Sequence, residues 1–280
     1  MTYRRFLHHL KRGNLSFIGR LIYTPLVKSE LLLIRFRDGR EAFSDTHLVD
    51  EKLTAVIKTF ERPATLVRLV DSIKRFYPNM KIIVVDDSRE PSQLDGVTTI
   101  VMPYNSGVSA GRNRGLLEVK TKYLMLLDDD FIFYRQTDLR RAIELMDKNE
   151  EIDIMGGEVV NLPQFKADDF RNAGLHPSDA VSTMPPGSEI DGLPVYDKVA
   201  NFFIAHPKRL RLVGWDERLK RLDHADFFTR AKGVLTTVFN HSFKVLHAQT
   251  PFDREYMKKR DDMDQDHAIL YDKYYKQIND

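Results

Sequence analysis

The chain has 280 residues and a formal net charge of only +2, with 42% hydrophobic and 30% charged residues. This length suits one catalytic domain with insertions, and the composition excludes wholesale disorder. A net charge near zero gives no global field for nucleic acid, so we expect no nucleic-acid partner. The absence of cysteine excludes disulfides and thiolate metal sites, and it is compatible with a cytoplasmic location.

The first 40 residues are basic, with nine Lys or Arg and only two acids, Glu30 and Asp38. The segment has no continuous apolar core, so it reads neither as a secretory signal nor as a spanning helix. Two interpretations stay open: contact with an anionic membrane, at the inner face of the cytoplasmic membrane, or a helix or hairpin packed on the main domain. Its apolar residues recur at roughly helical spacing: Phe6, Leu7, Leu10, Phe17, Ile18, Leu21 and Ile22.

From Leu53 onward, short apolar runs alternate with amphipathic stretches. Such alternation predicts an α/β fold, with a mostly parallel sheet flanked by helices. Nearly continuous apolar runs are expected of strands that are covered on both faces. We expect strands at Leu53–Thr59, Lys81–Asp86, Val97–Met102, Tyr123–Leu127 and Ile152–Val160, and helices at Ala64–Phe76, Val108–Val119 and Asp138–Lys148.

These patterns divide the chain into a single catalytic domain with two extensions. We expect a basic N-terminal extension at residues 1–50, the catalytic domain at residues 51–250, and a helical C-terminal tail at residues 251–280. The stretch from Asn161 to Pro194 is rich in Pro, Gly, Asp and Ser. Because long loops in compact domains are often binding loops, this stretch is a candidate acceptor-binding loop.

Three consecutive acids, Asp128, Asp129 and Asp130, follow a predicted buried strand. Ligands bind outside the carboxyl ends of the strands in open parallel sheets. Carboxylates that lie this close repel each other, so a bound cation would relieve the repulsion. Hard oxygen ligands suit Mg²⁺ or Mn²⁺ that bridges to substrate phosphates. The alternative is a solvated acidic turn that caps the next segment.

Two weaker patterns are predicted at the same edge of the sheet. Asp86, Asp87 and Ser88 end an earlier strand, where an acid can accept hydrogen bonds from a ribose or a base; this sequence is also good turn chemistry. The glycine-rich stretch Gly107–Gly115 opens a helix and carries Arg112 and Arg114, either of which could pair with a phosphate. Alone, that stretch is an ordinary loop with surface arginines.

Together these motifs resemble the GT-A glycosyltransferases of family two, in order and in spacing. The version in this chain is most similar to the β1,4-N-acetylgalactosaminyltransferases that build gangliosides. The resemblance covers roughly residues 53–250 and rests on several motifs in register. These motifs include Lys58-Thr59-Phe60, Asp86-Asp87-Ser88, Ala110-Gly111-Arg112-Asn113, Asp128-Asp129-Asp130-Phe131, Gly156-Gly157, Asn201-Phe202-Phe203, His224-Ala225-Asp226-Phe227-Phe228 and Val245-Leu246-His247-Ala248.

The resemblance implies a Rossmann-like GT-A fold and an inverting, metal-dependent glycosyltransferase. Such an enzyme would move GalNAc, GlcNAc or Gal from a UDP-sugar to a hydroxyl of a glycan or glycolipid acceptor, in surface polysaccharide synthesis. Asp128 and Asp130 match the Asp-x-Asp motif, in which the first acid faces the ribose and the second binds Mn²⁺ or Mg²⁺. His247 matches a late histidine that completes the metal coordination. The other implied donor-binding residues are Thr59, Arg62, Asp86, Asp87, Arg112 and Asp129.

The catalytic base is where the chain departs from the family pattern. Family-two enzymes usually have Glu-Asp at the start of a nearby helix, and this pair is absent here. Asp226 is the first candidate, because the ganglioside-type enzymes keep an acid at that position. Asp223 and His224 stay open as alternatives, since histidine titrates near neutral pH. Trp215 could stack on an acceptor sugar or belong to the core.

Two other functions were weighed. A sugar-phosphate nucleotidyltransferase would carry a glycine-rich, arginine-containing loop after the first strand, where this chain has Thr59–Pro63. A non-catalytic carbohydrate-binding protein on a transferase core would not need an intact donor site. The presence of Asp128, Asp130, Arg112 and His247 argues against it.

Overall fold

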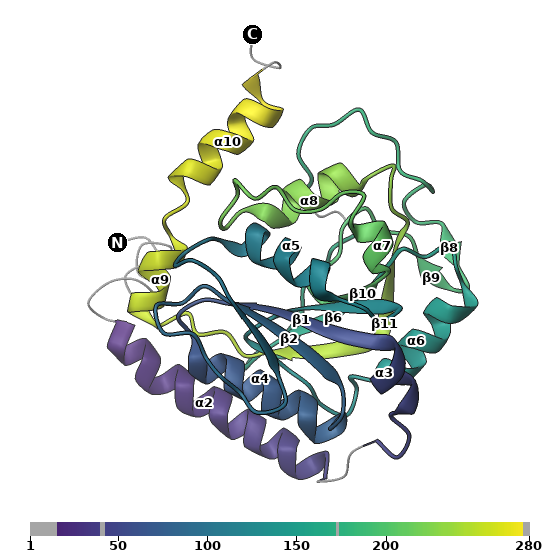
Figure 1. The fold of residues 1–280 in the computed structure, drawn as a ribbon. Coiled ribbons are helices and arrows are strands. Elements are labelled where there is room, and N and C mark those ends of the chain that lie inside the picture. The colour runs from purple at the N-terminus through teal and green to yellow at the C-terminus, as the bar shows by residue number, and fades with distance from the viewer. Residues whose placement is uncertain (1–15, 40–42, 172–173, 277–280) are drawn as a thin grey trace.

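A computed structural model describes residues 16–39, 43–171 and 174–276, which form a curled central sheet with helices on both faces (Figure 1). The strand order is β3-β2-β1-β4-β10-β6-β11-β5, with β7 paired to β6 beside this path. The expected α/β fold with a helix-flanked sheet is therefore confirmed. Phe6, Leu7 and Leu10 of the predicted basic segment lie outside the described residues.

The first half of the sheet is parallel. β1 (Leu53–Thr59) lies between β2 (Lys81–Asp86) and β4 (Tyr123–Asp128), and β3 (Thr98–Val101) extends the sheet beyond β2. The apolar side chains of β1, β2 and β4 are almost entirely buried, because helices cover both faces. These strands agree with the sequence expectations to within one residue at each end.

Two helices cover opposite faces of this half (Figure 1). α4 (Pro63–Phe76) begins with proline in its first turn, where no backbone donor is needed, and buries its apolar stripe against the sheet. α5 (Val108–Glu118) packs closely on β1 and β2. Any side chain at Gly115 would run into Val56, so glycine is what allows this close approach.

The second half of the sheet is mixed. β10 (Phe203–Ala205) runs antiparallel between β4 and β6 (Ile154–Asn161), whereas β11 (Thr237–His247) runs parallel to β6. The short β5 (Phe131–Ile132) pairs with the end of β11, in a register that places His247 opposite Phe131. This register brings a histidine from late in the chain beside the acids that follow β4.

The remaining elements are short or peripheral. In the described part of the long stretch between β6 and β10, the strands have two residues each, and α10 extends away from the sheet at the C-terminus (Figure 1). Within the described residues, no helix is both long enough and apolar enough to span a membrane. The remaining short or peripheral elements are α3 (His47–Lys52), α6 (Leu139–Lys148), β7 (Lys166–Ala167), β8 (Glu189–Ile190), β9 (Leu193–Pro194), α7 (Pro207–Leu210), α8 (Asp223–Ala231), α9 (Arg254–Arg260) and α10 (Asp264–Tyr274).

The N-terminal helix α2 (Ser16–Arg37) lies along the outer side of α4 (Figure 1). Val27 and Ile34 are buried in a small apolar cluster with the end of β11. The Tyr23 hydroxyl donates to the carbonyl of Leu162 at 2.9 Å, and Arg75 of α4 donates to the carbonyl of Arg35 at 2.8 Å. This part of the basic segment is therefore a helix that packs on the domain by one face.

The core around Gly157 is tightly packed with aromatic rings. Phe202 stacks on Phe243 with ring centroids 4.4 Å apart, and Phe131 contacts Phe202 edge-on at 6.0 Å. A Cβ atom at Gly157 would lie 2.5 Å from the carbonyl oxygen of Phe243 and closer still to the ring of Phe202. The backbone oxygen cannot move aside without disturbing the β6–β11 pairing.

We therefore expect Gly157→Ala to lower the free energy of unfolding by about 1–3 kcal/mol, as overpacked cores do. Gly174→Ala is the matched control, since nothing lies within 4 Å of a Cβ at that exposed position. Urea unfolding of both variants measures the difference. Equal stability of the two variants would contradict the packing described here.

Candidate active site

A pocket of about 340 Å³, the central pocket, opens at the carboxyl ends of β1 and β4. The start of α5, the start of α8, the end of β11 and α9 complete its walls. Lys58 of β1 and Asp128 of β4 are register partners in the sheet, so the two strands end at the same place. This is the edge at which parallel sheets bind ligands.

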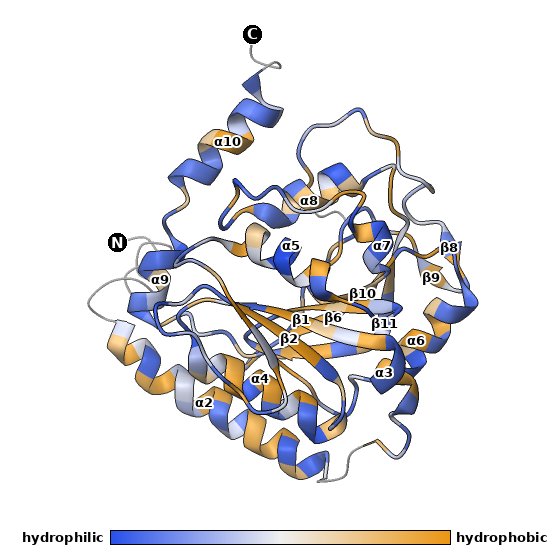
Figure 2. Ribbon diagram, in the orientation of Figure 1, coloured by the Kyte–Doolittle hydropathy of each residue, from blue (hydrophilic) through white to orange (hydrophobic). Residues whose placement is uncertain are grey.

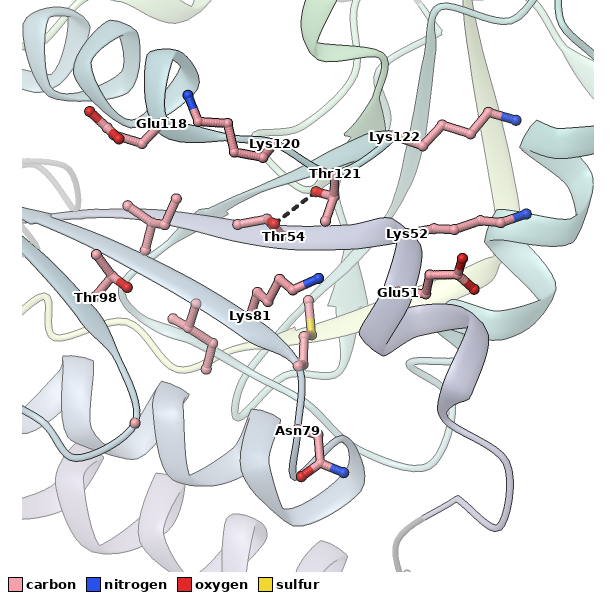
Figure 3. Close-up of a pocket in the computed structure, with 14 residues that line it drawn as sticks. Glu51, Lys52, Thr54, Asn79, Lys81, Thr98, Glu118, Lys120, Thr121 and Lys122 are labelled. Carbon is pink, nitrogen blue, oxygen red and sulfur yellow. Dashed lines mark hydrogen bonds between the residues drawn. The ribbon is translucent and has the colours of Figure 1, made fainter.

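A larger cavity of about 660 Å³ lies at the opposite edge, where β1, β2 and β4 begin (Figure 3). Lysines dominate its lining, and two of them, Lys52 and Lys122, are already paired with Asp147. None of the predicted site residues lies there. The central pocket is smaller, but it gathers buried acids and cations, and we therefore take it as the candidate active site.

Arg112 bridges two acids from distant parts of the chain. Its guanidinium donates to Oδ1 of Asp128 at 2.7 Å and to Oδ2 of Asp223. Arg112 is only 2% exposed. Burial alone would lower the pKa of Arg112, but the two carboxylates outweigh burial and raise it. Arg112 therefore stays charged and fixes β4, α5 and α8 relative to one another.

Arg62 neutralises the other two acids of the triplet. Its guanidinium donates to Oδ2 of Asp130 at 2.9 Å and to Oδ1 of Asp129, and it lies 4.1 Å from the ring centroid of Tyr256. The hydroxyl of Thr59 donates to Asp129 at 2.7 Å. Burial raises the pKa of Asp129, and the nearby Asp130 charge adds to this effect. Thr59 and Arg62, both predicted as donor-binding residues, thus lie with the acids.

His247 and Asp130, the two residues for which the resemblance implies metal binding, lie side by side. Nε2 of His247 lies 3.2 Å from Oδ1 of Asp130, and Nδ1 lies 2.9 Å from Oδ1 of Asn161. Burial alone would lower the pKa of His247, but the Asp130 carboxylate outweighs it and raises the pKa. Burial also opposes the ionised form of Asp130, yet Arg62 and His247 together hold its pKa well below the usual range.

The residues around Asp130 fit a divalent cation as part of a shared site. A carboxylate and an imidazole are both common metal ligands, and Asn161 orients the imidazole from behind. Among the described residues, however, no group of three or more His, Asp or Glu side chains could hold a metal. Asp130 and His247 would thus supply two ligands, and substrate oxygens and water would have to supply the rest.

Asp86, the last residue of β2, and Asp87, which follows it, have different positions. Asp86 is 1% exposed and accepts hydrogen bonds from the backbone N–H groups of Ser88 and Ser92 at 2.9 and 2.8 Å, so it orders the following loop. Asp87 lines the central pocket and accepts from Lys58 and from the N–H of Gly107 at 2.9 Å. Asp87 thereby positions the glycine-rich start of α5.

The three candidates for the base differ in access. Asp223 and His224 line the central pocket, whereas Asp226 is fully buried outside it. Burial lowers the pKa of His224 to about 3, and its Nε2–H donates to the carbonyl of Val199 at 2.7 Å, so this ring is neutral. Asp226 is held by cations and a hydroxyl, at 2.6 Å from Lys273, 2.7 Å from Tyr274 and 2.9 Å from Arg230.

Trp215 lies in the core. It is 5% exposed and stacks on Phe227 with ring centroids 4.7 Å apart, and it does not line the central pocket. Its backbone N–H donates to Asn113 at 2.8 Å, which ties this segment to α5. Of the two interpretations of Trp215, its environment favours the core.

The C-terminal helices contribute residues that the sequence patterns did not single out. Tyr256, Arg260 and Met263 line the central pocket. The buried carboxylate of Asp266 accepts hydrogen bonds from three consecutive backbone N–H groups, those of residues 220, 221 and 222, at 3.1, 2.7 and 2.8 Å. These residues directly precede Asp223. The sequence of this charged C-terminal helix contains no local pattern that predicts the hydrogen bonds of Asp266.

The fold and the acidic site define the class of protein. The architecture is similar to that of the crystal structure of S. aureus TarS residues 1–349, with a TM-score of 0.55 at 15% sequence identity, over 70% of this chain and 60% of that one. TarS is a GT-A glycosyltransferase, so this likeness establishes the GT-A fold. Further structures of the same fragment hold UDP and UDP-GlcNAc.

Sequence comparison points to the same class. Residues 54–173 match the model of glycosyl transferase family 2, so this part of the chain is similar to a family 2 glycosyltransferase domain. It is 37% identical to mouse beta-1,4 N-acetylgalactosaminyltransferase 2 over 192 residues, which are 65% of this chain. It is 34% identical to human beta-1,4 N-acetylgalactosaminyltransferase 1 over 203 residues, again 65% of this chain. The chain covers only 36% of each of these two relatives.

The surroundings of Asp226 predict a structural role that depends on pH. Burial raises the pKa of Asp226, but the bonds from Lys273, Tyr274 and Arg230 outweigh burial and lower it below the usual value of 3.8. A lowered folded-state pKa contributes stability that is complete above the unfolded-state pKa and is lost as pH falls through the folded-state pKa.

We expect Asp226→Asn to lower the free energy of unfolding by about 3 kcal/mol at pH 7, because it leaves Lys273 and Arg230 without their buried partner. The difference from wild type should begin to shrink as pH falls below 3.8 and should vanish below the lowered folded-state pKa, where the wild-type carboxylate is protonated as well. Urea unfolding between pH 3 and pH 7 measures this, with the exposed Asp264→Asn as control. A pH-independent difference would contradict the assignment.

Proposed function

We propose that the chain is an inverting, metal-dependent glycosyltransferase that moves a sugar from a UDP-sugar to a hydroxyl of a glycan or glycolipid acceptor. The observation that carries the proposal is the buried constellation at the end of β4, where Asp128, Asp129 and Asp130 meet Arg62, Arg112 and His247. Such a site can balance a diphosphate and its cation together, which a simple carbohydrate-binding surface does not require.

The donor end of the proposed site lies between β1, β4 and α5. Asp128 is the acid of the triplet with the most exposed side chain, at 37%, and it is available for a ribose hydroxyl. Arg62 lies where a diphosphate would meet the acids, and its guanidinium suits bidentate phosphate contacts. With UDP seen in the TarS fragment, UDP is the nucleotide we propose, and GalNAc, GlcNAc or Gal is the sugar.

The metal is Mn²⁺ or Mg²⁺ in this proposal, held by Asp130 and His247. When bound, the cation neutralises negative charge on the departing diphosphate. Arg62 now pairs with Asp130, so a cation there would compete for the same carboxylate and leave the guanidinium free to face the phosphates. The chain's own contribution is to hold both ligands in place, through Asn161 behind His247 and through the β5–β11 pairing.

Asp223 is the base that the geometry favours. It reaches the central pocket, its side chain is 4% exposed, and burial raises its pKa despite the Arg112 contact. In the proposed step, Asp223 takes the proton of the acceptor hydroxyl as that oxygen attacks the anomeric carbon. The bond from this carbon to the diphosphate oxygen breaks on the opposite side, UDP leaves, and the anomeric configuration inverts.

The acceptor and the cellular setting extend the proposal. The relatives' names place N-acetylgalactosaminyl transfer among the reactions of this family, and we propose a surface polysaccharide or glycolipid under construction as the acceptor. The loop at residues 161–194 and the start of α8 are where we expect acceptor and sugar contacts, since single hydrogen bonds there can decide specificity. We expect the protein to act at the inner face of the cytoplasmic membrane.

The class and the metal are tested by UDP release. With Mn²⁺ and a panel of UDP-sugars, wild type should hydrolyse one donor slowly, and EDTA should abolish the release. Asp130→Ala should reduce the release at least a hundredfold, because it removes one of two protein ligands and the partner of Arg62. No metal-dependent release and no UDP binding would overturn the proposal. Pyrophosphate release from a nucleoside triphosphate would instead indicate a nucleotidyltransferase.

The base is tested by comparing two isosteric variants. Asp223→Asn should lower kcat about a hundredfold or more while UDP binding persists, as expected when a general base is lost. Asp226→Asn should retain most of its kcat at a temperature where it is folded, since its carboxylate does not reach the pocket. The reverse order of activities would return the role to Asp226. His224→Gln serves as the third variant and should retain activity.

A further inference from the structure

The outer face of α2 is the largest concentration of exposed apolar side chains on one element of the described chain. The side chain of Phe36 is 88% exposed, and those of Leu21 and Leu32 are 68% exposed each. Figure 2 shows apolar stretches that recur along α2 at the outer side of the fold. The exposed apolar residues of this helix are Phe17, Ile18, Leu21, Ile22, Leu26, Leu32, Leu33 and Phe36.

These side chains share one side of the helix. With about 100° between successive residues, the eight fall within roughly half of the helix circumference. The residues that bury α2 against the domain, among them Gly19, Val27 and Ile34, point to the opposite side. A helix that only covered a core would need one apolar side. The second apolar side of α2 is left without a partner in the described residues.

The charges beside this face identify its partner. α2 carries Arg20, Lys28, Arg35 and Arg37 but only one acid, Glu30. On the same helical geometry, Arg20, Lys28 and Arg35 follow one edge of the apolar face, as in helices that lie in a membrane interface. A second copy of this helix would bring like charges together. The preceding residues 1–15 are also basic, so they too would be repelled.

We propose that α2 docks the protein on an anionic lipid surface, with Phe17–Phe36 as the inserted face and the basic edge at the phosphate headgroups. The apolar side chains supply hydrophobic burial, and each Lys or Arg near the surface adds electrostatic attraction. α2 is held to the domain through Val27, Ile34 and the Tyr23 hydroxyl, so the whole catalytic domain follows the helix to the membrane.

The position of α2 also determines which part of the domain lies near the lipid surface. Arg20, Tyr23 and Lys28 of α2 line a groove of about 350 Å³ whose other wall includes Arg62. Arg62 also lines the central pocket. Docking through α2 therefore brings the candidate active site beside the lipid surface, where an acceptor carried by a lipid would be presented to it.

Vesicle sedimentation tests the proposal. At 0.1 M salt, the full chain should sediment with vesicles of phosphatidylcholine and phosphatidylglycerol at 70:30, and much less with phosphatidylcholine alone. Leu33→Glu/Phe36→Glu should lower the partition coefficient at least tenfold, since it places charge on the inserted face. The matched control is Val181→Glu/Leu212→Glu, at positions of similar exposure away from α2, which should bind as wild type does.

A second variant separates charge from apolar burial. Arg20→Gln/Lys28→Gln/Arg35→Gln should lower binding to the anionic vesicles about a hundredfold and leave the weak binding to neutral vesicles unchanged. Absence of wild-type binding to anionic vesicles, or equal binding by Leu33→Glu/Phe36→Glu, would overturn the proposal. So would a lipid-free dimer that only Leu33→Glu/Phe36→Glu dissociates, because the face would then join two copies.

The docking proposal stands independently of the transferase reaction. UDP release in lipid-free buffer should be the same for wild type and for Leu33→Glu/Phe36→Glu, and their melting temperatures should agree. Loss of vesicle binding with intact UDP release would therefore report on the docking face alone. Loss of UDP release in Asp130→Ala with intact vesicle binding would report on the active site alone.

Discussion

The buried contact of Arg112 with Asp128 and Asp223 is the interaction on which the candidate site depends. It joins the end of β4 to the start of α8 through a residue of α5, and those three elements supply opposite walls of the central pocket. Removing one partner of a buried ion pair costs more than the pair itself contributes, because an uncompensated charge remains. The arrangement therefore tolerates little change of size or loss of hydrogen-bonding capacity at any of the three positions, whereas an isosteric amide at position 223 can still accept from Arg112.

The same constraint bears on how three acids can lie so close together. Asp128, Asp129 and Asp130 are consecutive, and carboxylates in such proximity repel one another unless cations lie nearby. Arg112 pairs with Asp128, and Arg62 pairs with Asp129 and Asp130. His247 of β11 also lies beside Asp130. Each acid of the triplet thus has a cationic partner before any ligand enters, and a diphosphate would arrive with its own cation.

The parallel half of the fold could be predicted from the sequence because its strands are continuous apolar runs, and Lys81–Asp86 matched to the residue. The mixed half could be predicted only in part. The strand expected at Ile152–Val160 is β6 (Ile154–Asn161), but β10 has three residues and its antiparallel pairing is decided by tertiary contacts. The grouping of Asp128, Asp130 and His247 in one pocket agrees with the order of the motifs. The contacts of Asp226 and of Asp266 could not be predicted, because both involve α10, which has no fixed spacing from the motifs it contacts.

Helices near both ends of the described chain, α2 and α9, lie beside Arg62, although neither helix belongs to the stretch that matches family 2. From the N-terminal side, α2 shares a groove with this arginine; from the C-terminal side, the ring of Tyr256 in α9 lies against its guanidinium. An aromatic face under a guanidinium restrains its plane and leaves its edge N–H groups free to bind oxygen atoms. The stretch that matches family 2 thus supplies Arg62. The ring of Tyr256 in α9 restrains the orientation of its guanidinium, and α2 forms the surface beside it.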